Sequence, residues 1–532
     1  MLQFNLKSYF ENGDTWVNKV SIGQEESSNL ETAAKAKNSG FVIRWSAIAI
    51  MSTIVALSGW ALSSPVGSSP DDDYHLPSIW CGQGFRDGLC EEGSEPGSVQ
   101  VPKTTMANSV CFAFDPDKSG KCEYSNSLVG LKDHNLNNKL YPPAFYWSMS
   151  WFASEDIAAA TISMRIINSI LVILVITTLT VLLPIHLRRI PAIAILISCM
   201  PLGIFLIPST NPSGWAFISL VIIFSALLGF LSVRDGARRW WLGGMVIFGL
   251  FMGAGSRPDT AAYSIITLGI ASWLSYSRKK LRPVNVLLIT TSVISLVYIH
   301  FSSRQSQSIL SGGFQLQTSN SQTPQPNFFV NLAQLPELWV GVFGKWGLGW
   351  LDTPMPAVVW TVTLSIFTGV IFASVRWFDF RQSLAMFGVI GALVIIPMYI
   401  LTVSSLSVGQ QIQPRYLLPL IALLGALALY RSSSTTGLEL SRGQVVMIGT
   451  GLFISNALAL HLNTRRYVTG MDVNGLNLDK SIEWWWTEFP ISPSTVWITA
   501  SLSFALLLFS LWKLRQVLGL PGDSNVNKKV EN

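Results

Sequence analysis

The sequence predicts an all-α membrane protein with many transmembrane helices, and three observations lead to this fold class. Hydrophobic residues make up 49% of the 532 residues, and the mean hydropathy is +0.41. Only 12% of the residues are charged, whereas a soluble domain has roughly a quarter. The apolar residues also gather in about twelve stretches near the ~20-residue length that spans a bilayer. These features exclude a soluble globular protein, an intrinsically disordered chain and a nucleic-acid binder.

The predicted helices follow the apolar stretches in chain order. They lie at 46–63, 166–183, 190–207, 215–233, 240–255, 260–273, 284–299, 357–375, 384–403, 416–430, 445–462 and 496–512. The expected segments are a cytoplasmic tail at 1–44, a first helix at 45–63, a loop at 64–165, helices two to seven within 166–299, a loop at 300–356, helices eight to twelve within 357–512 and a tail at 513–532. The loop at 64–165 is far longer than a simple connection requires.

Lys and Arg side chains predict the orientation, because cytoplasmic loops retain positive charge. With the N-terminus in the cytoplasm, the inner loops hold thirteen Lys and Arg, whereas the short outer loops hold only Arg257 and Arg415. The thirteen are Arg188, Arg189, Arg234, Arg238, Arg239, Arg278, Lys279, Lys280, Arg282, Arg376, Arg381, Arg431 and Arg442. We therefore expect both termini in the cytoplasm and the loop at 64–165 outside, and we attribute the net charge of +6 to topology.

Four of the five cysteines fall in the first long loop, which agrees with its placement outside. Cys81, Cys90, Cys111 and Cys122 would share an oxidising compartment, so two disulfides are expected. The sequence leaves three pairings open, of which Cys81 with Cys90 and Cys111 with Cys122 are the most local. Their spacings do not match the C-x-x-C pattern of a zinc site.

Three consecutive carboxylates follow the first predicted helix closely. Asp71, Asp72 and Asp73 come directly after a proline, so a short tether holds them near the outer face of the membrane. Two interpretations stand side by side: a turn or helix cap, which Asp favours, or a catalytic cluster. The residues from His75 to Trp80 favour a short amphipathic helix lying along the membrane interface. The later sequence KLYPPAFYWSMSWF predicts a helix start after the double proline and an aromatic return to the headgroup region.

This order of motifs resembles the GT-C superfamily of polytopic glycosyltransferases, which use polyprenyl-phosphate-linked sugars. Within it, PDDDYH is similar to the Pro-Asp-Glu-x-x-His element of the bacterial membrane family called domain of unknown function 2142. The resemblance places Asp71 at the Asp position, Asp72 at the Glu position and His75 at the His position. Asp73 departs from the pattern, which has a small residue or proline there, and the four-cysteine segment has no general family counterpart.

A second motif of the same family lies before a late helix. QPRYLLPL resembles the family's Gln-x-Arg-Tyr-x-x-Pro element, which places Gln413, Arg415 and Tyr416 in the predicted substrate site. Arg257 and Arg415 stand at outer helix ends, where an unpaired charge is costly and a lipid phosphate would pair with it. The alternatives are snorkelling and, for Arg257, an ion pair with the nearby Asp259.

The predicted function is a glycosyltransferase of the bacterial plasma membrane, with its active site facing outside. It would move a sugar from polyprenyl phosphate to a cell-envelope glycan, lipid or protein, inverting the anomeric centre. Asp71 is the first candidate for the general base and Asp72 the second, because a sugar hydroxyl must lose its proton as it attacks. Asp73, His75, Arg257, Arg415, Tyr416 and Gln413 would bind substrate.

Two matters stay open at the level of sequence. Three adjacent carboxylates suit Mg²⁺ or Ca²⁺, although a lipid-monophosphate donor needs no metal in order to leave. The alternative functions are a transporter or flippase of lipid-linked glycan, and a non-catalytic membrane protein of envelope assembly. Against transport, the polar residues gather on one side of the membrane and no inverted repeat is evident.

Overall fold

The computed structural model describes residues 40–520, except 235, 278–282, 303, 305–326, 377, 432–439 and 488. Most of the two predicted tails and much of the predicted loop at 300–356 therefore lie outside the described residues. An N-terminal helix spans Gly40–Leu62, so it begins before the apolar stretch that predicted it.

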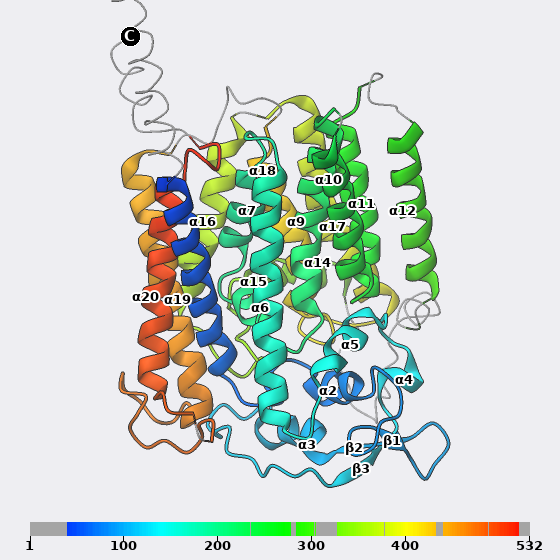
Figure 1. The fold of residues 1–532 in the computed structure, drawn as a ribbon, viewed down its shortest axis with the longest axis vertical. Helices are drawn as coiled ribbons and strands as arrows, with labels where there is room; N and C mark the ends of the chain where they lie inside the picture. The colour runs from blue at the N-terminus through cyan, green and yellow to red at the C-terminus, as the bar shows by residue number, and fades with distance from the viewer. Residues whose placement is uncertain are drawn as a thin grey trace, which may run out of the picture.

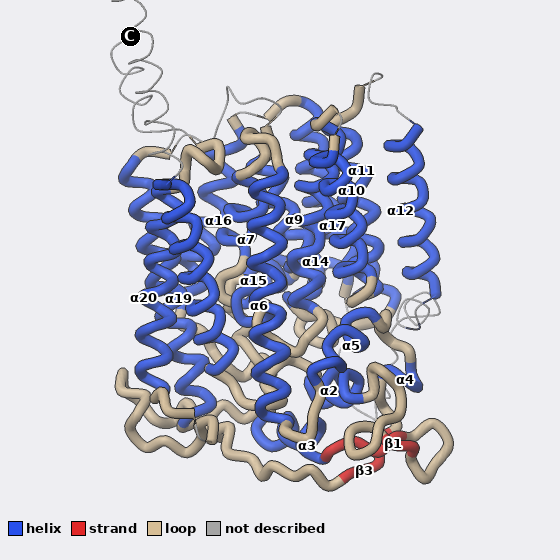
Figure 2. Tube along the Cα trace, in the orientation of Figure 1, coloured by secondary structure: helices blue, strands red, loops and turns tan. Residues whose placement is uncertain are grey.

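The long helices run side by side and form a bundle whose two ends differ (Figure 1). At one end, the described connections between helices are short, such as residues 183–188. The other end carries residues 63–156, which fold into short helices, a small sheet and loops, and it is called here the loop-rich end (Figure 2). The sequence PDDDYH at 70–75, called here the Asp71 motif, lies at this end, together with the starts of α11 (Pro258–Leu274) and α18 (Pro414–Leu429).

The bundle helices after the N-terminal one alternate in direction from one pass to the next. They are α6 (Ile157–Leu182), α7 (Arg189–Ser198), α8 (Leu202–Leu206), α9 (Ser213–Ser232), α10 (Ala237–Ala254), α11 (Pro258–Leu274), α12 (Pro283–Ser302), α16 (Ala357–Val375), α17 (Phe380–Val403), α18 (Pro414–Leu429), α19 (Arg442–Val468) and α20 (Pro493–Lys513), with the short α7 and α8 together making one pass. Two short helices, α14 (Phe328–Gln334) and α15 (Pro336–Val342), precede α16.

Among the described residues, eight helices are long and apolar enough to cross a membrane. They are the N-terminal helix, α6, α9, α12, α16, α17, α19 and α20. The other four predicted stretches form α7 with α8, α10, α11 and α18. The third stretch is broken because Pro201 has no amide hydrogen to donate, so α7 ends at Ser198 and α8 begins after the proline. The predicted all-α polytopic class is thus confirmed, but the count of twelve spans is not.

Helix α9 lies at the centre of the bundle. Every residue in its most apolar window is buried, and it packs against α7, α10, α11 and α18. A helix that is apolar on all sides is stable only when other helices surround it. This central position brings the connection before α9 beneath the loop-rich end, where it meets the Asp71 motif.

The loop-rich end is built on short elements. They are α2 (Asp72–Trp80), β1 (Glu91–Glu92), β2 (Val99–Pro102), α3 (Lys103–Phe112), β3 (Leu128–Leu131), α4 (Asn135–Asn138), α5 (Ala144–Met149) and a 3₁₀ turn, η1 (Ser150–Phe152). The strands form an antiparallel sheet in the order β1-β2-β3, with Glu91 opposite Gln100 and Val99 opposite Leu131.

Two disulfides close this region, as the sequence predicted. The structure selects the local pairing, Cys81 with Cys90 and Cys111 with Cys122. The first bond joins the end of α2 to the segment before β1, and the second joins α3 to the loop that follows it. Cys199 is buried and free.

The prediction that His75 to Trp80 lie along the membrane interface is wrong. These residues form most of α2, and His75, Leu76, Ile79 and Trp80 are at most 1% exposed. The helix packs against α3 and α5 within the loop-rich end, so protein covers the sides that were expected to meet lipid. Only some of the aromatic residues that were predicted to lie in the headgroup region are exposed. Phe145 and Tyr146 are buried, whereas Trp147 and Trp151 are 50% and 64% exposed.

Candidate active site

Residues 63–70 form a buried, irregular segment that leads into Asp71. Buried carbonyl groups require hydrogen-bond donors, and side chains from distant elements supply them. Arg165 on α6 donates to the carbonyl oxygens of Ala61, Ser64 and Pro65, at 2.6–3.0 Å, and to Ser68 Oγ. Trp350 Nε1 donates to Gly67 O and Asn211 Nδ2 to Pro70 O. These hydrogen bonds therefore hold the backbone that leads into Asp71.

Asp72 faces inward from this segment and is fully buried. Its Oδ2 accepts the Ser69 amide at 2.9 Å, and its two oxygens accept the Thr210 hydroxyl at 2.9 and 3.1 Å. Burial raises the pKa of Asp72 to about 7, although Arg165, Thr210 and Ser69 act in the opposite direction. Through these contacts, Asp72 links the start of α2 to the connection before α9.

Asp71 faces a different set of partners. Its backbone lies in the left-handed region, at φ 57° and ψ 27°, which Asp tolerates better than most residues. Its Oδ2 lies 2.5 Å from Nη2 of Arg415 in the first turn of α18. The Asp71 side chain is 36% exposed, whereas that of Arg415 is 2% exposed. Burial raises the pKa of Asp71, but the charges of Arg415 and Arg257 outweigh this and hold it below its ordinary value.

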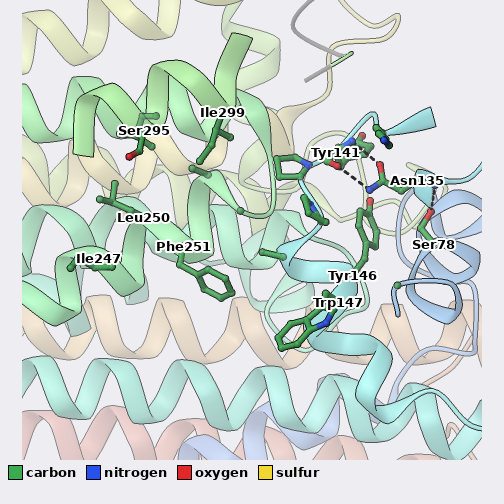
Figure 3. Close-up of a pocket in the computed structure, with 18 of the residues that line it drawn as sticks. Ser78, Asn135, Tyr141, Tyr146, Trp147, Ile247, Leu250, Phe251, Ser295 and Ile299 are labelled. Atoms are coloured by element: carbon green, nitrogen blue, oxygen red, sulfur yellow. Dashed lines mark hydrogen bonds between the residues drawn. The ribbon is translucent and has the colours of Figure 1, made fainter. Parts of the chain in front are cut away.

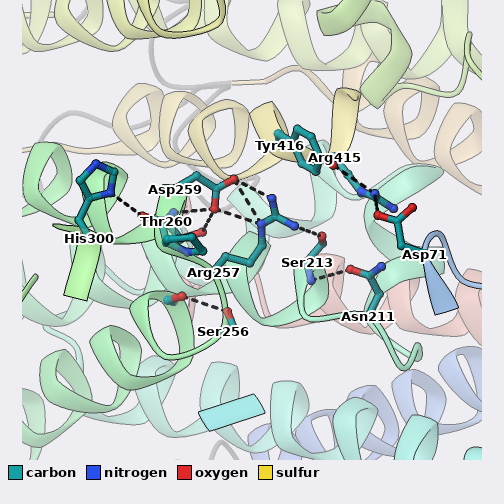
Figure 4. A network of polar contacts seen from close by, with 12 residues as sticks. Asp71, Asn211, Ser213, Ser256, Arg257, Asp259, Thr260, His300, Arg415 and Tyr416 are labelled. Atoms are coloured by element: carbon teal, nitrogen blue, oxygen red, sulfur yellow. Dashed lines mark hydrogen bonds and ion pairs between the residues drawn. The ribbon is translucent and has the colours of Figure 1, made fainter. Parts of the chain in front are cut away.

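Arg257 forms the second ion pair of the site (Figure 4). Its Nε and Nη2 donate to Asp259 at 3.0 and 2.9 Å, and its Nη1 lies 3.3 Å from Ser213 Oγ. The ring of Tyr416 lies against both cations, with its centroid 4.5 Å from Arg257 Cζ and 5.2 Å from Arg415 Cζ. Tyr416 therefore joins the two ion pairs into one cluster.

His75 lies behind Asp71 among aromatic rings. Its Nδ1 is 2.8 Å from the Tyr146 hydroxyl, and its ring centroid is 5.3 Å from that of Tyr141. Its Nε2 is buried and has no hydrogen-bond partner in the described part of the chain. Burial lowers the pKa of His75 to about 3, so the imidazole is neutral at pH 7.

Asp71 opens into a cavity of about 480 Å³, called here the Asp71 cavity. Arg257 and Asp259 also line it, whereas Arg415 does not and so stands behind Asp71. The other lining residues are Leu140, Tyr141, Pro258, Ala262, Tyr263, His300, Ile396, Pro397, Tyr399, Ile400, Gln411, Ile412, Gln413, Tyr416 and Leu417.

A second, larger cavity of about 940 Å³ runs between α10 and α12 and is called here the α10–α12 groove. Figure 3 shows Ile247, Leu250 and Phe251 of α10 and Ile299 of α12 along its apolar part, with Tyr141 at its far end. Tyr141 lines both cavities. The α10–α12 groove thus ends beside the Asp71 cavity, which holds the carboxylate of Asp71 and the cation of Arg257.

Comparison with known proteins assigns the family. The model of DUF2142, described as a predicted membrane protein, matches residues 54–424, more than half of the chain. The chain belongs to this family. Among solved structures, ArnT from Cupriavidus metallidurans in the apo state is similar, with 12% sequence identity and a TM-score of 0.38, over 90% of this chain and 78% of that chain. No curated protein sequence matches the chain.

In this DUF2142 protein, most of the predicted site residues come together. Asp71, Arg257, Gln413 and Tyr416 line one cavity, with His75 and Arg415 directly behind it. Asp72 and Asp73 do not line it. Asp72 is bonded inward, and Asp73 Oδ1 accepts its neighbouring Tyr74 amide at 3.0 Å.

Sequence reasoning missed the groups that hold this DUF2142 site in place. Thr210 and Asn211 fix the Asp71 motif, and Asp259 was considered only as an alternative partner of Arg257. Arg165 also holds the segment before Asp71, by donating to carbonyl groups. One signal was available: the polar run 209–213 separates two apolar stretches on the same side as the acidic cluster.

The three consecutive carboxylates do not converge on one point. Asp71 pairs with Arg415, Asp72 with Ser69 and Thr210, and Asp73 with the backbone. No group of three or more metal-ligating side chains occurs within the described ranges.

Proposed function

We propose that this DUF2142 protein is an inverting glycosyltransferase that uses a polyprenyl-phosphate-linked sugar, with its site at the loop-rich end on the outer face of the membrane. The observation that carries the proposal is the Asp71 cavity, in which an ionised carboxylate and a cation face one space beside an apolar groove. The acceptor belongs to the cell envelope.

Asp71 serves as the general base in this proposal. The acceptor hydroxyl attacks the anomeric carbon, its proton passes to Asp71, and the bond from that carbon to the phosphate oxygen breaks. The electron pair leaves with the phosphate. A base must be unprotonated and within hydrogen-bond reach of the proton it takes. Arg415 meets the first requirement by keeping Asp71 ionised, and the exposed part of the side chain meets the second.

Arg257 is the cation for the departing phosphate. It lines the cavity with Asp71, whereas Arg415 stands behind the carboxylate. A fixed cation in a site of low water content stabilises charge that develops on a leaving group. The α10–α12 groove suits the polyprenyl chain, because its α10 and α12 walls are mostly apolar and it ends at Tyr141 beside Arg257. Arg415 is then a positioning residue, although the sequence suggested direct phosphate contact.

The test is transfer of a radiolabelled sugar from undecaprenyl phosphate by the full chain in nanodiscs. The acceptor in this assay is an extract of cell-envelope lipids and glycans. Asp71→Asn should lower turnover by about 10² to 10⁴, because an amide cannot take the proton. Donor binding, measured separately, should be retained.

Asp73→Asn is the matched control, since it makes the same change two residues away, outside the cavity. Near-wild-type transfer by Asp71→Asn would remove Asp71 as the base. Movement of the intact donor across the bilayer without sugar transfer would instead favour a flippase.

A further inference from the structure

The Asp71 cavity and the α10–α12 groove share a narrow wall. Along the turn before α5, Leu140 faces the cavity, Tyr141 faces both spaces, and Pro142 faces the groove. At the end of α12, the consecutive residues Ile299 and His300 line the groove and the cavity respectively. The two cavities are thus adjacent, and Tyr141 lies where they meet.

The Asp71 cavity carries several hydrogen-bonding groups without partners. The side-chain hydroxyls of Tyr141, Tyr263 and Tyr399 and the amides of Gln411 and Gln413 all belong to its lining, and none has a hydrogen bond within the described residues. Amides and phenols can both donate and accept. Five groups that can donate and accept hydrogen bonds thus surround one space, which suits a ligand rich in hydroxyl groups.

Charge distinguishes among such ligands. Both carboxylates of the cavity are paired, Asp71 with Arg415 and Asp259 with Arg257. Apart from the donor phosphate assigned to Arg257, a ligand in this cavity would therefore meet little net charge. This favours an uncharged sugar over a phosphorylated or acidic one, because burying an unpaired charge is expensive.

The remaining wall indicates how the sugar is delivered. Ala262 of α11, Ile396 and Ile400 of α17 and Leu417 of α18 supply apolar surface to the same cavity. Helix α17 is one of the eight candidate membrane spans, and its Tyr399 is 51% exposed near the loop-rich end. A free oligosaccharide would leave this surface wetted, whereas a lipid-anchored sugar would cover it.

We infer that the Asp71 cavity is the acceptor compartment, and that the acceptor is an uncharged sugar headgroup carried by a membrane lipid. This inference rests on the proposed function, in which the donor tail occupies the α10–α12 groove. The lipid would approach along α17 and present a hydroxyl to Asp71, while the donor chain lies in the α10–α12 groove and the donor phosphate reaches Arg257 past Tyr141.

Photo-crosslinking tests the compartment without requiring turnover. The full chain in nanodiscs is labelled with a diacylglycerol-linked hexose that carries a diazirine on the sugar, and labelled peptides are mapped by mass spectrometry. We expect saturable labelling of the segments around Tyr399 and Gln411–Gln413. An undecaprenyl-phosphate probe with a diazirine in its chain should label Leu250, Phe251 and Ser295 instead.

Variants of the unbonded amides supply the second measurement. Gln411→Ala and Gln413→Ala should each weaken saturable hexose-lipid labelling by about three- to tenfold, the range for one lost hydrogen bond. Gln410→Ala is the control, because Gln410 lies outside the cavity lining and its side chain accepts the Ser407 amide. It should leave labelling unchanged.

The outcomes separate the two proposals. The inference is overturned if the hexose lipid labels the α10–α12 groove, or if diacylglycerol without the sugar labels the cavity equally well. It is also overturned if a soluble hexose oligosaccharide competes as strongly as the hexose lipid. If the undecaprenyl-phosphate probe fails to label the groove while the hexose lipid labels the cavity, the donor assignment fails and the sugar-lipid compartment stands.

Discussion

Asp71 and Asp72 are neighbours in the chain, yet the fold gives them opposite environments. Asp72 is fully buried and is bonded to a backbone amide and a hydroxyl, and its pKa is raised to about 7. Asp71 is 36% exposed, opens into a cavity and is paired with Arg415, and its pKa is lowered. The difference shows that neighbouring carboxylates of one motif can have different roles, because Asp72 is bonded to the backbone while Asp71 faces a cavity.

The largest expected effect concerns the anchored side of this comparison. Arg165→Ala should destabilise the protein by about 3–5 kcal/mol, because it leaves buried carbonyl groups without donors. Thermal unfolding in detergent would measure the loss. Arg238→Ala is the control, since Arg238 is exposed and has one carbonyl partner. If the two variants unfold alike, the buried segment does not depend on Arg165.

The next prediction concerns the substrate side. Arg415→Gln removes the charge that keeps Asp71 ionised, so the pKa of Asp71 should rise. The acid limb of the turnover profile should then move to higher pH by about 1–3 units, the usual effect of one close Arg. If Arg415 only contacted the donor phosphate, Arg415→Gln would raise the KM for the donor and leave the acid limb of the turnover profile at the same pH. Arg257→Gln should show that second behaviour more strongly than the first.

Asp72 supplies a pH dependence of stability rather than of turnover. Its folded-state pKa, about 7, lies above its ordinary value of 3.8, so the folded state holds the proton more tightly than the unfolded state. This contribution is complete below about pH 4 and is lost as the pH rises towards 7; it is worth at most about 4 kcal/mol. Asp72→Asn should flatten that part of the stability profile. If the free energy of unfolding of Asp72→Asn had the same slope between pH 4 and 7 as that of the wild type, Asp72 would be ionised in the folded state.

The smallest effect is expected at Asp73. Within the described residues, its side chain accepts a hydrogen bond from the adjacent amide at the start of α2 and from no other group, so Asp73→Asn should change stability by less than about 0.5 kcal/mol and leave transfer close to wild type. Unfolding and transfer assays run in parallel would measure both quantities. A loss of transfer comparable to that of Asp71→Asn would mean that the acidic motif acts as a unit and that the comparison drawn here is wrong.

Much of the fold was predictable because it depends on local sequence. Apolar runs of membrane length predicted the positions of the bundle helices, with differences at their ends, such as the start of α6 at Ile157. The clustering of four cysteines predicted two disulfides. The interfacial placement of α2 failed because an apolar face indicates burial without saying whether lipid or protein covers it.

By itself, the sequence determined the membrane class, the position of the acidic motif after the first helix, and the presence of Arg257 and Arg415 at helix starts. Only the tertiary structure decided which Asp faces a cavity, because Arg415, Thr210 and Arg165 reach the motif from 344, 138 and about a hundred residues away. It also decided that Tyr141 lines both cavities. The length of an apolar stretch is a property of contiguous residues, so the sequence alone reveals it. The environment of a carboxylate instead depends on charged and hydrogen-bonding groups that come together only when distant helices pack.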